Sequence, residues 1–177
     1  MATIEATTID GVIIVEPKVW RDDRGLFVET FRQEWLGDAP AMVQANRADR
    51  RNNTLVGMHY HLHQADYWYV PTGEVLVALH DLRTSSPTDR VSLMFELGGG
   101  SHRGVYIPPG VAHGLLTRSH ATVTYLVDHY YDPADELGVA WDDPELALEW
   151  PTSAPVLSDR DRANPRRAAL ALDLLPG

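Results

Sequence analysis

Residues 56–73 read VGMHYHLHQADYWYVPTG: histidines occupy three alternate positions, and an aspartate and four large residues follow before a Pro-Thr-Gly turn. Alternate side chains of an extended strand share one face, with their Cα atoms roughly 6.5–7 Å apart, so His59, His61 and His63 are expected on the same side. Two of them could chelate one ion, but three on a straight strand rarely could. Taken alone, the stretch is compatible with a metal site, a catalytic base or a polar strand face.

The segments around this stretch favour strands. They are rich in β-branched residues or alternate in polarity, and turn signals separate them: GVIIVEPKVW (11–20), GEVLVALHDLR (73–83), VSLMFEL (91–97), GVYIPP (104–109) and ATVTYLVDHYY (121–131). Only FRQEWL (31–36) and PRRAALALDLL (165–175) look helical. Several short strands at this spacing predict an all-β sandwich or barrel with short helices.

Composition limits the kind of protein. The chain has 177 residues, 44% of them hydrophobic, so it can bury one sizeable core, and we predict a single domain over residues 1–177. A formal net charge of −10 disfavours nonspecific binding to nucleic acid or to anionic membranes. The chain has no apolar run of membrane-spanning length, and its start, MATIEATTIDG, lacks the features of a secretion signal, so we expect a cytoplasmic protein. Because cysteine is absent, a bound metal would need histidine, carboxylate or water ligands.

Two segments resemble the metal-binding motifs of the cupin superfamily. The first is His59-x-His61, four residues, Asp66, six residues and a glycine, with aspartate where glutamate is usual. The second is GVYIPPGVAH (104–113), which ends at His113. The resemblance implies a cupin double-stranded β-helix, or jelly-roll, barrel in which His59, His61, Asp66 and His113 are candidate ligands for Mn, Fe, Ni or Zn. Imidazole and carboxylate suit these ions without selecting one of them.

A second resemblance covers the chain from about residue 11 to residue 165, and a tail over 166–177 is expected to be helical. The segments that carry it are DDRGLFVETF (22–31), QANR (44–47), GMHY (57–60), VALHDLRTSSPT (77–88), VYIPPGVAHG (105–114), TVTYLVDHYYDPADELGVAWDDPELALEWP (122–151) and LSDRD (157–161). Their order is similar to that in dTDP-4-dehydrorhamnose 3,5-epimerases, so the chain is identified as a divergent member of this cupin family. The resemblance implies an isomerase that inverts C3, C5 or both in a nucleotide-linked 4-keto-6-deoxyhexose.

Inversion next to a ketone requires a base that removes a proton, stabilisation of the enolate, and an acid that returns a proton to the opposite face. The resemblance implies that His59 is the base, that Asp161 orients and charges its imidazole, and that Tyr125 is the acid. Without the resemblance, a strand histidine or tyrosine would more often be structural, and Asp161 would be an ordinary aspartate at a helix start.

The resemblance also implies a substrate-binding set and a partner. An aromatic ring such as Tyr131 can stack on a nucleotide base. The implied substrate-binding residues are Arg24, Phe27, Glu29, Gln44, Asn46, His61, Asp66, His113 and Tyr131. The family also implies a homodimer, in which the strand TIDGVIIVEPKVW (8–20) crosses to the partner.

Two substitutions separate this chain from the usual family pattern. Val56 stands where the family has an arginine that faces phosphate, and Asp66 stands where it has a lysine near the keto oxygen. Both substitutions remove a cation, and a carboxylate should repel an enolate. Arg47, Arg50 and Arg51 lie just upstream, where they either contact phosphate from another direction or form a solvated charged surface.

Three functions therefore stay open. The first is the epimerase, which requires no cofactor. The second is a metal-dependent cupin isomerase or oxygenase that acts on another carbonyl or enol substrate, and the third is a non-catalytic cupin that binds a sugar nucleotide. A divalent ion could stabilise an enolate as a Lewis acid in place of the lost lysine. Because a metal-bound His59 could not also be a free base, proton abstraction would then fall to Tyr125, His63 or a metal-bound hydroxide.

Overall fold

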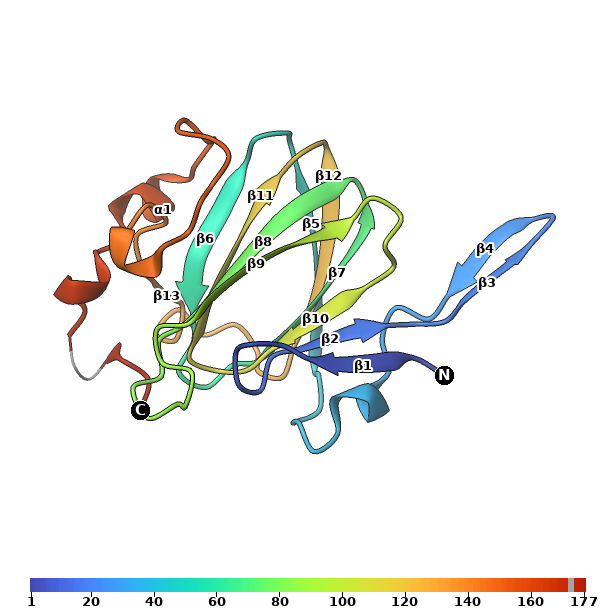
Figure 1. Cartoon of the computed structure of the whole chain (residues 1–177), viewed down its shortest axis with the longest axis horizontal. Helices are drawn as coiled ribbons and strands as arrows, with labels where there is room; N and C mark the ends of the chain where they lie inside the picture. The colour runs from blue at the N-terminus through green and yellow to red at the C-terminus, as the bar shows by residue number, and fades with distance from the viewer. Residues whose placement is uncertain (172–173) are drawn as a thin grey trace.

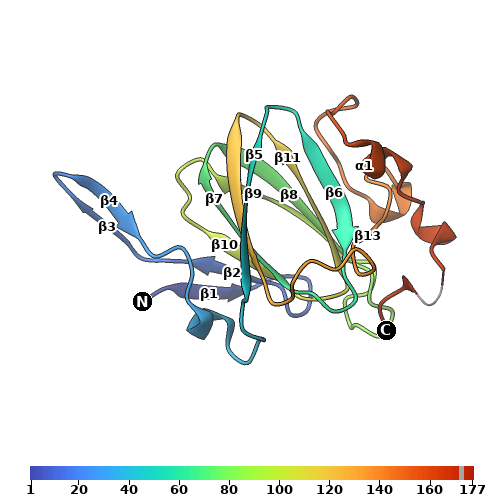
Figure 2. The same ribbon diagram turned by 180° about the vertical axis from the view of Figure 1, so that it is seen from behind.

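Two antiparallel β-sheets face each other around a shared hydrophobic core (Figures 1 and 2). The computed structural model describes residues 1–171 and 174–177. The six-stranded sheet has the order β1-β2-β10-β7-β12-β5, with bounds Thr3–Ala6, Ile13–Glu16, Gly104–Ile107, Asp66–Thr72, Ala121–Val127 and Gln44–Arg50. The five-stranded sheet has the order β13-β6-β11-β8-β9, with bounds Leu137–Gly138, Leu55–Tyr60, Val111–Thr117, Glu74–Asp81 and Ser92–Gly98.

From β5 onward the chain passes back and forth between the two sheets, except at the β8–β9 hairpin, so most strands that pair within one sheet are not neighbours in sequence. Strand β7, for example, lies between β10 and β12, and β11 lies between β6 and β8. This alternation is the arrangement of a jelly-roll barrel, and the predicted all-β class is confirmed.

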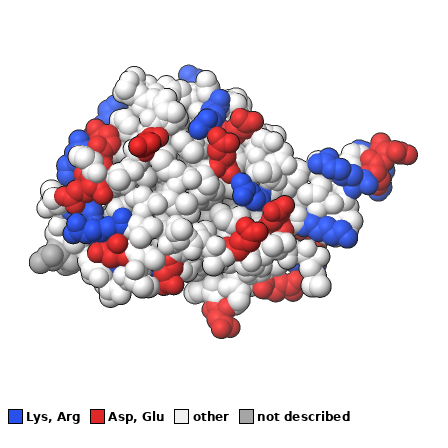
Figure 3. Space-filling model, in the orientation of Figure 1, with Lys and Arg blue, Asp and Glu red and all other residues white. Residues whose placement is uncertain are grey.

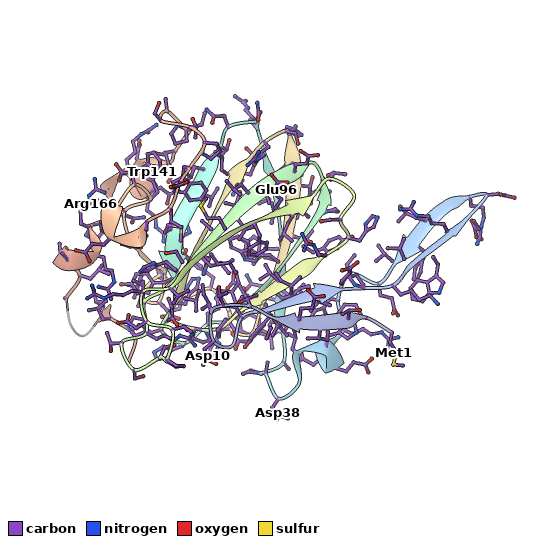
Figure 4. All side chains as sticks on the ribbon, in the orientation of Figure 1. Met1, Asp10, Asp38, Glu96, Trp141 and Arg166 are labelled. Carbon is purple, nitrogen blue, oxygen red and sulfur yellow. The ribbon has the colours of Figure 1, made fainter. Side chains whose placement is uncertain are left out.

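The core lies between the sheets because alternate residues of each strand point inward. Strand β8 contributes Val75, Val77 and Leu79 to it. Residues on the outer face of β8 are also buried, because the C-terminal part of the chain covers them: Leu76 clusters with Trp141, which lies beside β6 (Figure 4). The continuous apolar character of β8 thus reflects burial on both faces.

A two-stranded hairpin, β3 (Val19–Asp22) and β4 (Gly25–Val28), projects away from the sheets (Figure 1). Trp20 and Phe27 on this hairpin are 42% and 63% exposed, and their ring centroids lie 5.7 Å apart. Charged side chains of both signs also lie on it (Figure 3). The hairpin therefore presents aromatic surface that the rest of the chain does not cover.

Helical structure is scarcer than the sequence suggests. The described helices are three 3₁₀ turns and one α-helix: η1 (Gln33–Leu36), η2 (Pro144–Leu146), η3 (Arg167–Ala169) and α1 (Asp159–Ala163). No continuous helix runs through the described residues of the segment 165–175: η3 forms there, and Leu174 is again in 3₁₀ conformation. Residues 172–173 lie outside the described residues, so the helical tail stays a prediction. Arg167 is drawn inward instead: its backbone N–H donates to Asp143 and its guanidinium to Asp89. No helix in the described parts of the chain is long and apolar enough to cross a bilayer.

The buried His80 on β8 makes stability depend on pH. Its Nδ1 lies 2.7 Å from the Ser92 hydroxyl, and burial lowers its pKa to about 4. The folded protein keeps His80 neutral, whereas the unfolded chain binds a proton below about pH 6.5, so stability falls as pH drops from about 6.5 to 4. We expect the wild type to lose about 1–3 kcal/mol more unfolding free energy than His80→Gln over this interval in urea titrations. Equal losses in the two proteins would contradict this assignment.

Candidate active site

A cavity of about 190 Å³ lies between the two sheets. Val56 and His59 of β6 line it together with His113 of β11, and Trp68 of β7 and Tyr125 of β12 line it from the other sheet. The cavity is thus a continuation of the barrel interior in which polar groups replace the apolar side chains of the core.

Strand β6 reaches its place through a close approach to β11. His59 lies directly opposite His113 in the antiparallel register. Gly57 has a φ of +113°, and a Cβ at this position would come 2.6 Å from the carbonyl oxygen of His113. Only glycine accepts both the backbone conformation and the contact without strain. Gly57 therefore sets the spacing that brings the two histidines to the same cavity.

The three alternate histidines do not share a strand face, so that prediction is wrong. Strand β6 ends before His61, although His59 and His61 both line the cavity. His63 is exposed and is not among the lining residues. Three successive backbone N–H groups, of residues 62–64, donate to the carboxylate of Asp135. This carboxylate turns the chain between β6 and β7 and thereby directs His63 away from the cavity.

His59 and Asp161 form a hydrogen-bonded pair, with 2.6 Å between Nε2 and Oδ1. Asp161 lies in the first turn of α1, where the Ser158 hydroxyl caps the helix by accepting from the Asp161 backbone N–H. Burial, the largest single effect, raises the pKa of Asp161, but the hydrogen bond and charge of His59 together with the hydrogen bonds of Ser158 and of the Gly57 backbone outweigh it. The pKa is therefore lowered, and the carboxylate is ionised at neutral pH. The pairing places the proton on Nε2 and leaves a lone pair on Nδ1, which faces Glu136 Oε1 at 3.8 Å.

Tyr125 faces the cavity from the opposite sheet. On β12 it pairs with Asn46 of β5 and Trp68 of β7. Burial, with the negative charge of Asp66 as a further cause, raises the pKa of the Tyr125 hydroxyl. The phenol therefore keeps its proton at neutral pH. His59 and Tyr125 together give the cavity an acceptor from one sheet and a donor from the other.

His61, Asp66 and His113 form a buried group in which one ligand atom from each residue lies within 4.8 Å of the others. The His61 and His113 ring centroids are 5.4 Å apart. Burial lowers the pKa of His113 to about 4, so this imidazole is neutral at neutral pH. Of the four ligands predicted from the cupin motifs, the structure groups these three. His59 is not among them, since its Nε2 is bonded to Asp161.

A second pocket, of about 200 Å³, adjoins the cavity and shares part of its lining, including Tyr125 and Glu136. Gln44, Asn46 and Tyr131 complete its wall. Gln44 donates to the Asn46 side chain at 2.9 Å, and the two residues share the inward face of β5 because they stand two positions apart. The structure thus brings these three predicted binding residues next to the cavity.

Positive charge is scarce in the cavity. Arg50 is the one lysine or arginine among the described residues that lines it. Arg47 lies on the outward face of β5 and pairs with Asp49 at 3.1 Å, and Arg51 is exposed beyond the end of the strand. Val56 lines the cavity as an apolar side chain. Of the three upstream arginines, Arg50 is therefore the one placed to meet an anionic ligand.

Three predicted binding residues do not reach this cavity within one chain. Arg24 and Phe27 lie on the projecting hairpin, where Arg24 is paired with Asp22 at 2.6 Å. Glu29 follows the hairpin and pairs with Arg32 at 2.8 Å. None of the three lines the cavity or the adjoining pocket.

Two polar residues that line the cavity, Gln64 and Glu136, were not predicted from the sequence. Gln64 stands two residues before Asp66 and donates to it at 2.9 Å. Glu136 lies in the segment 122–151 that carries the family resemblance, so its position could have marked it as a candidate site residue. No local pattern marked Gln64, because its role depends on the turn made by residues 62–64.

Comparison with known proteins identifies relatives along nearly the whole chain. The family model described as dTDP-4-dehydrorhamnose 3,5-epimerase matches residues 6–168. The chain is 36% identical over 163 residues to the dTDP-4-dehydrorhamnose 3,5-epimerase of Shigella flexneri, covering 88% of this chain and 90% of the relative. It is 36% identical over 162 residues to the dTDP-4-dehydrorhamnose 3-epimerase of Streptomyces niveus, covering 87% and 78%. The crystal structure of a dTDP-6-deoxy-D-glucose-3,5-epimerase from Legionella pneumophila, in complex with dTDP-4-keto-L-rhamnose, matches with a TM-score of 0.93 and 35% identity, covering 99% of this chain and 98% of that one.

The two facing β-sheets form a cupin barrel, and the polar cavity lies between them. Together with the comparisons, these features define the class of protein as a cupin isomerase. The chain belongs to the dTDP-4-dehydrorhamnose 3,5-epimerase family. The predicted family, the cupin fold and the isomerase class are confirmed.

The close approach at Gly57 predicts a selective cost for adding one methyl group. Gly57→Ala should lower the free energy of unfolding, measured in urea, by at least about 2 kcal/mol more than Gly100→Ala. Gly100 is the matched control because its φ is also positive, +88°, but nothing lies within 4 Å of a Cβ there. Equal losses would show that the contact with His113 does not constrain β6.

Proposed function

We propose that the protein is a 3- or 3,5-epimerase of a dTDP-linked 4-keto-6-deoxyhexose. Family membership supports the substrate class, because relatives with this activity share about 35% identity with the chain. The observation that carries the proposal is the hydrogen bond between His59 and Asp161, at 2.6 Å. His59 lines the cavity, and the protonated Tyr125 lines it from the opposite sheet.

The geometry supports a two-residue proton transfer. Asp161 holds Nε2–H of His59, so Nδ1 is free to accept the proton from the carbon next to the C4 ketone. The ionised carboxylate stabilises the imidazolium that forms. Tyr125 then donates a proton to the other face of the same carbon, which inverts the stereocentre. This sequence of steps requires no cofactor.

The two adjoining pockets support separate binding places for the sugar and the nucleotide of one ligand. A cavity of about 190 Å³ is too small for a complete nucleotide sugar, since sites for ligands of that size usually exceed about 300 Å³. We therefore assign the sugar to the cavity, where His61, Asp66 and His113 form part of the wall. We assign the nucleotide to the pocket of Gln44, Asn46 and Tyr131.

The predicted binding residues on and just after the β3–β4 hairpin support a dimer. Arg24, Phe27 and Glu29 are proposed to bind substrate in the partner's site, because the hairpin that precedes Glu29 projects from the barrel and exposes Trp20 and Phe27. The predicted crossing of residues 8–20 to the partner is wrong for β2, which pairs with β1 and β10 of its own chain. The segment proposed to reach the partner is instead the hairpin over residues 19–28. A single cupin domain over residues 1–177 and a cytoplasmic location stay predictions; the core shared by the two sheets supports the first.

Deuterium exchange tests the proposed reaction. Incubation of dTDP-4-keto-6-deoxyglucose with the protein in D₂O should place deuterium at C3, or at C3 and C5, as NMR detects. His59→Asn should lower the exchange rate by about 10²–10⁴-fold, because it removes the base. Tyr125→Phe should retain exchange at a reduced rate while slowing inversion, because the enolate then lacks its acid on the second face.

His63→Asn is the matched control, since His63 is exposed and outside the cavity. It should exchange like the wild type. Absence of exchange above background in the wild type, or full exchange in His59→Asn, would contradict the proposal.

Light scattering during size-exclusion chromatography tests the dimer. The expected mass at micromolar concentration is twice the 19.7 kDa of the chain. Replacing the exposed hairpin aromatics in Trp20→Ser/Phe27→Ser should shift the protein toward the monomer. Val43→Ser, at a 48% exposed position away from the hairpin, should not. A monomeric wild type would refute the assignment of Arg24, Phe27 and Glu29 to a partner's site.

A further inference from the structure

Three side chains at the inner wall of the cavity converge as metal ligands do. His61, Asp66 and His113 come from three separate parts of the chain: the loop after β6, the first residue of β7, and β11. All three are at most 5% exposed, and their nearest ligand atoms lie within 4.8 Å of one another. Two imidazoles and one carboxylate form a donor set that suits divalent first-row transition metals and leaves coordination positions open.

Both histidines are oriented for coordination through Nε2. His61 Nδ1 lies 2.8 Å from the carbonyl oxygen of Asp135, and His113 Nδ1 lies 3.0 Å from that of Val111. Because a carbonyl oxygen only accepts, each Nδ1 carries a hydrogen, and Nε2 is the nitrogen of each ring that can coordinate an ion. Metal-binding histidines are commonly held in this way, with the second ring nitrogen donating to a backbone carbonyl or a carboxylate.

Asp66 is fixed in the same manner. Trp68 Nε1 donates to Oδ2 at 2.9 Å, and the Gln64 amide nitrogen donates to Oδ1 at 2.9 Å. The same Gln64 nitrogen lies 3.3 Å from His61 Nε2. One –NH₂ group thus contacts both His61 Nε2 and Asp66 Oδ1, and it lies between them, where a cation would be held. Rotation of the Gln64 amide would free both lone pairs.

Asp66 has little positive charge around it. It is 4% exposed, and no lysine or arginine in the described structure pairs with its carboxylate; the His61 imidazole lies 4.0 Å away. A cation held by this group would add positive charge to the cavity, where the enolate of an epimerase would form.

We propose that His61, Asp66 and His113 bind one divalent transition-metal ion, of the class that includes Mn, Fe, Ni and Zn, and that His59 stays outside the ligand set. Asp161 already holds Nε2 of His59, so the base and the ion occupy the cavity together. The ion's role rests on the proposed function: it would place positive charge beside the keto oxygen, in the region where Asp66 replaces the family's lysine.

Metal binding is tested directly on the full chain without a histidine tag. Protein treated with chelator is titrated with Zn²⁺, Mn²⁺, Ni²⁺ and, without oxygen, Fe²⁺ by calorimetry, and bound metal is measured by elemental analysis. We expect one ion per chain for at least one of these metals. Asp66→Asn, which retains an acceptor for Trp68, and His61→Gln should each weaken binding at least tenfold. His63→Gln, which removes an exposed histidine from the same loop, should not change it.

His59→Asn separates this proposal from a four-ligand site. It should bind the same ion within threefold of the wild-type affinity, although it lacks the proposed base. A loss of ten-fold or more would overturn the proposed ligand set, and so would wild-type protein that takes up none of the four ions. Circular dichroism and thermal melting of each variant exclude unfolding as the cause.

The proposal of a metal ion and the proposal of epimerase activity can be tested separately. Exchange of deuterium into the 4-keto sugar is measured with metal-free and reloaded protein. A rate at least tenfold higher after reloading supports the ion's role. Equal rates would overturn that role while leaving the epimerase intact, and metal binding without exchange in either form would refute the epimerase on which the role rests.

Discussion

The hydrogen bond between His59 Nε2 and Asp161 Oδ1 joins strand β6 to helix α1 across 102 residues of sequence. It depends on the C-terminal segment that covers the outside of the five-stranded sheet (Figure 2), and on the Ser158 cap that starts α1 beside His59. The bond fixes the imidazole tautomer and leaves Nδ1 as the acceptor in the cavity. It also separates His59 from His61 and His113, since an Nε2 that donates to a carboxylate cannot coordinate an ion.

The electrostatics of the cavity distinguish this chain from an ordinary member of its family. In the proposed reaction, negative charge would develop beside Asp66, whose two carboxylate oxygens accept hydrogen bonds from Gln64 and Trp68. Arg50 lines the same cavity from β5. Val56 lines it without charge. A bound cation at His61, Asp66 and His113 would restore the positive charge that two substitutions remove, without moving the base.

The sequence was sufficient for the parts of the structure that local patterns encode. Alternation and turn residues predicted the strands, and the motif order predicted the cupin barrel and the family. It failed where distant segments decide the geometry. His63 leaves the cavity because the Asp135 carboxylate turns residues 62–64, and no pattern near position 63 reveals a partner 72 residues away. Likewise, Arg167 at the start of η3 is held by Asp143 and Asp89, and the sequence of the tail does not reveal these distant partners. The resemblance to the cupin motifs implied four metal ligands, and the family resemblance implied the pairing of His59 with Asp161. The structure groups His61, Asp66 and His113 and bonds His59 to Asp161, a separation that the motif spacing does not reveal.

If His59 and Tyr125 act on opposite faces of one sugar ring, a crystal structure of the protein with a dTDP-linked 6-deoxyhexose that lacks the ketone will show it. We expect the sugar in the cavity between the two sheets, with His59 Nδ1 and Tyr125 Oη on opposite faces of the ring and each within about 3.5 Å of C3 or C5. A ring bound outside the cavity, or one with both side chains on the same face, would contradict it.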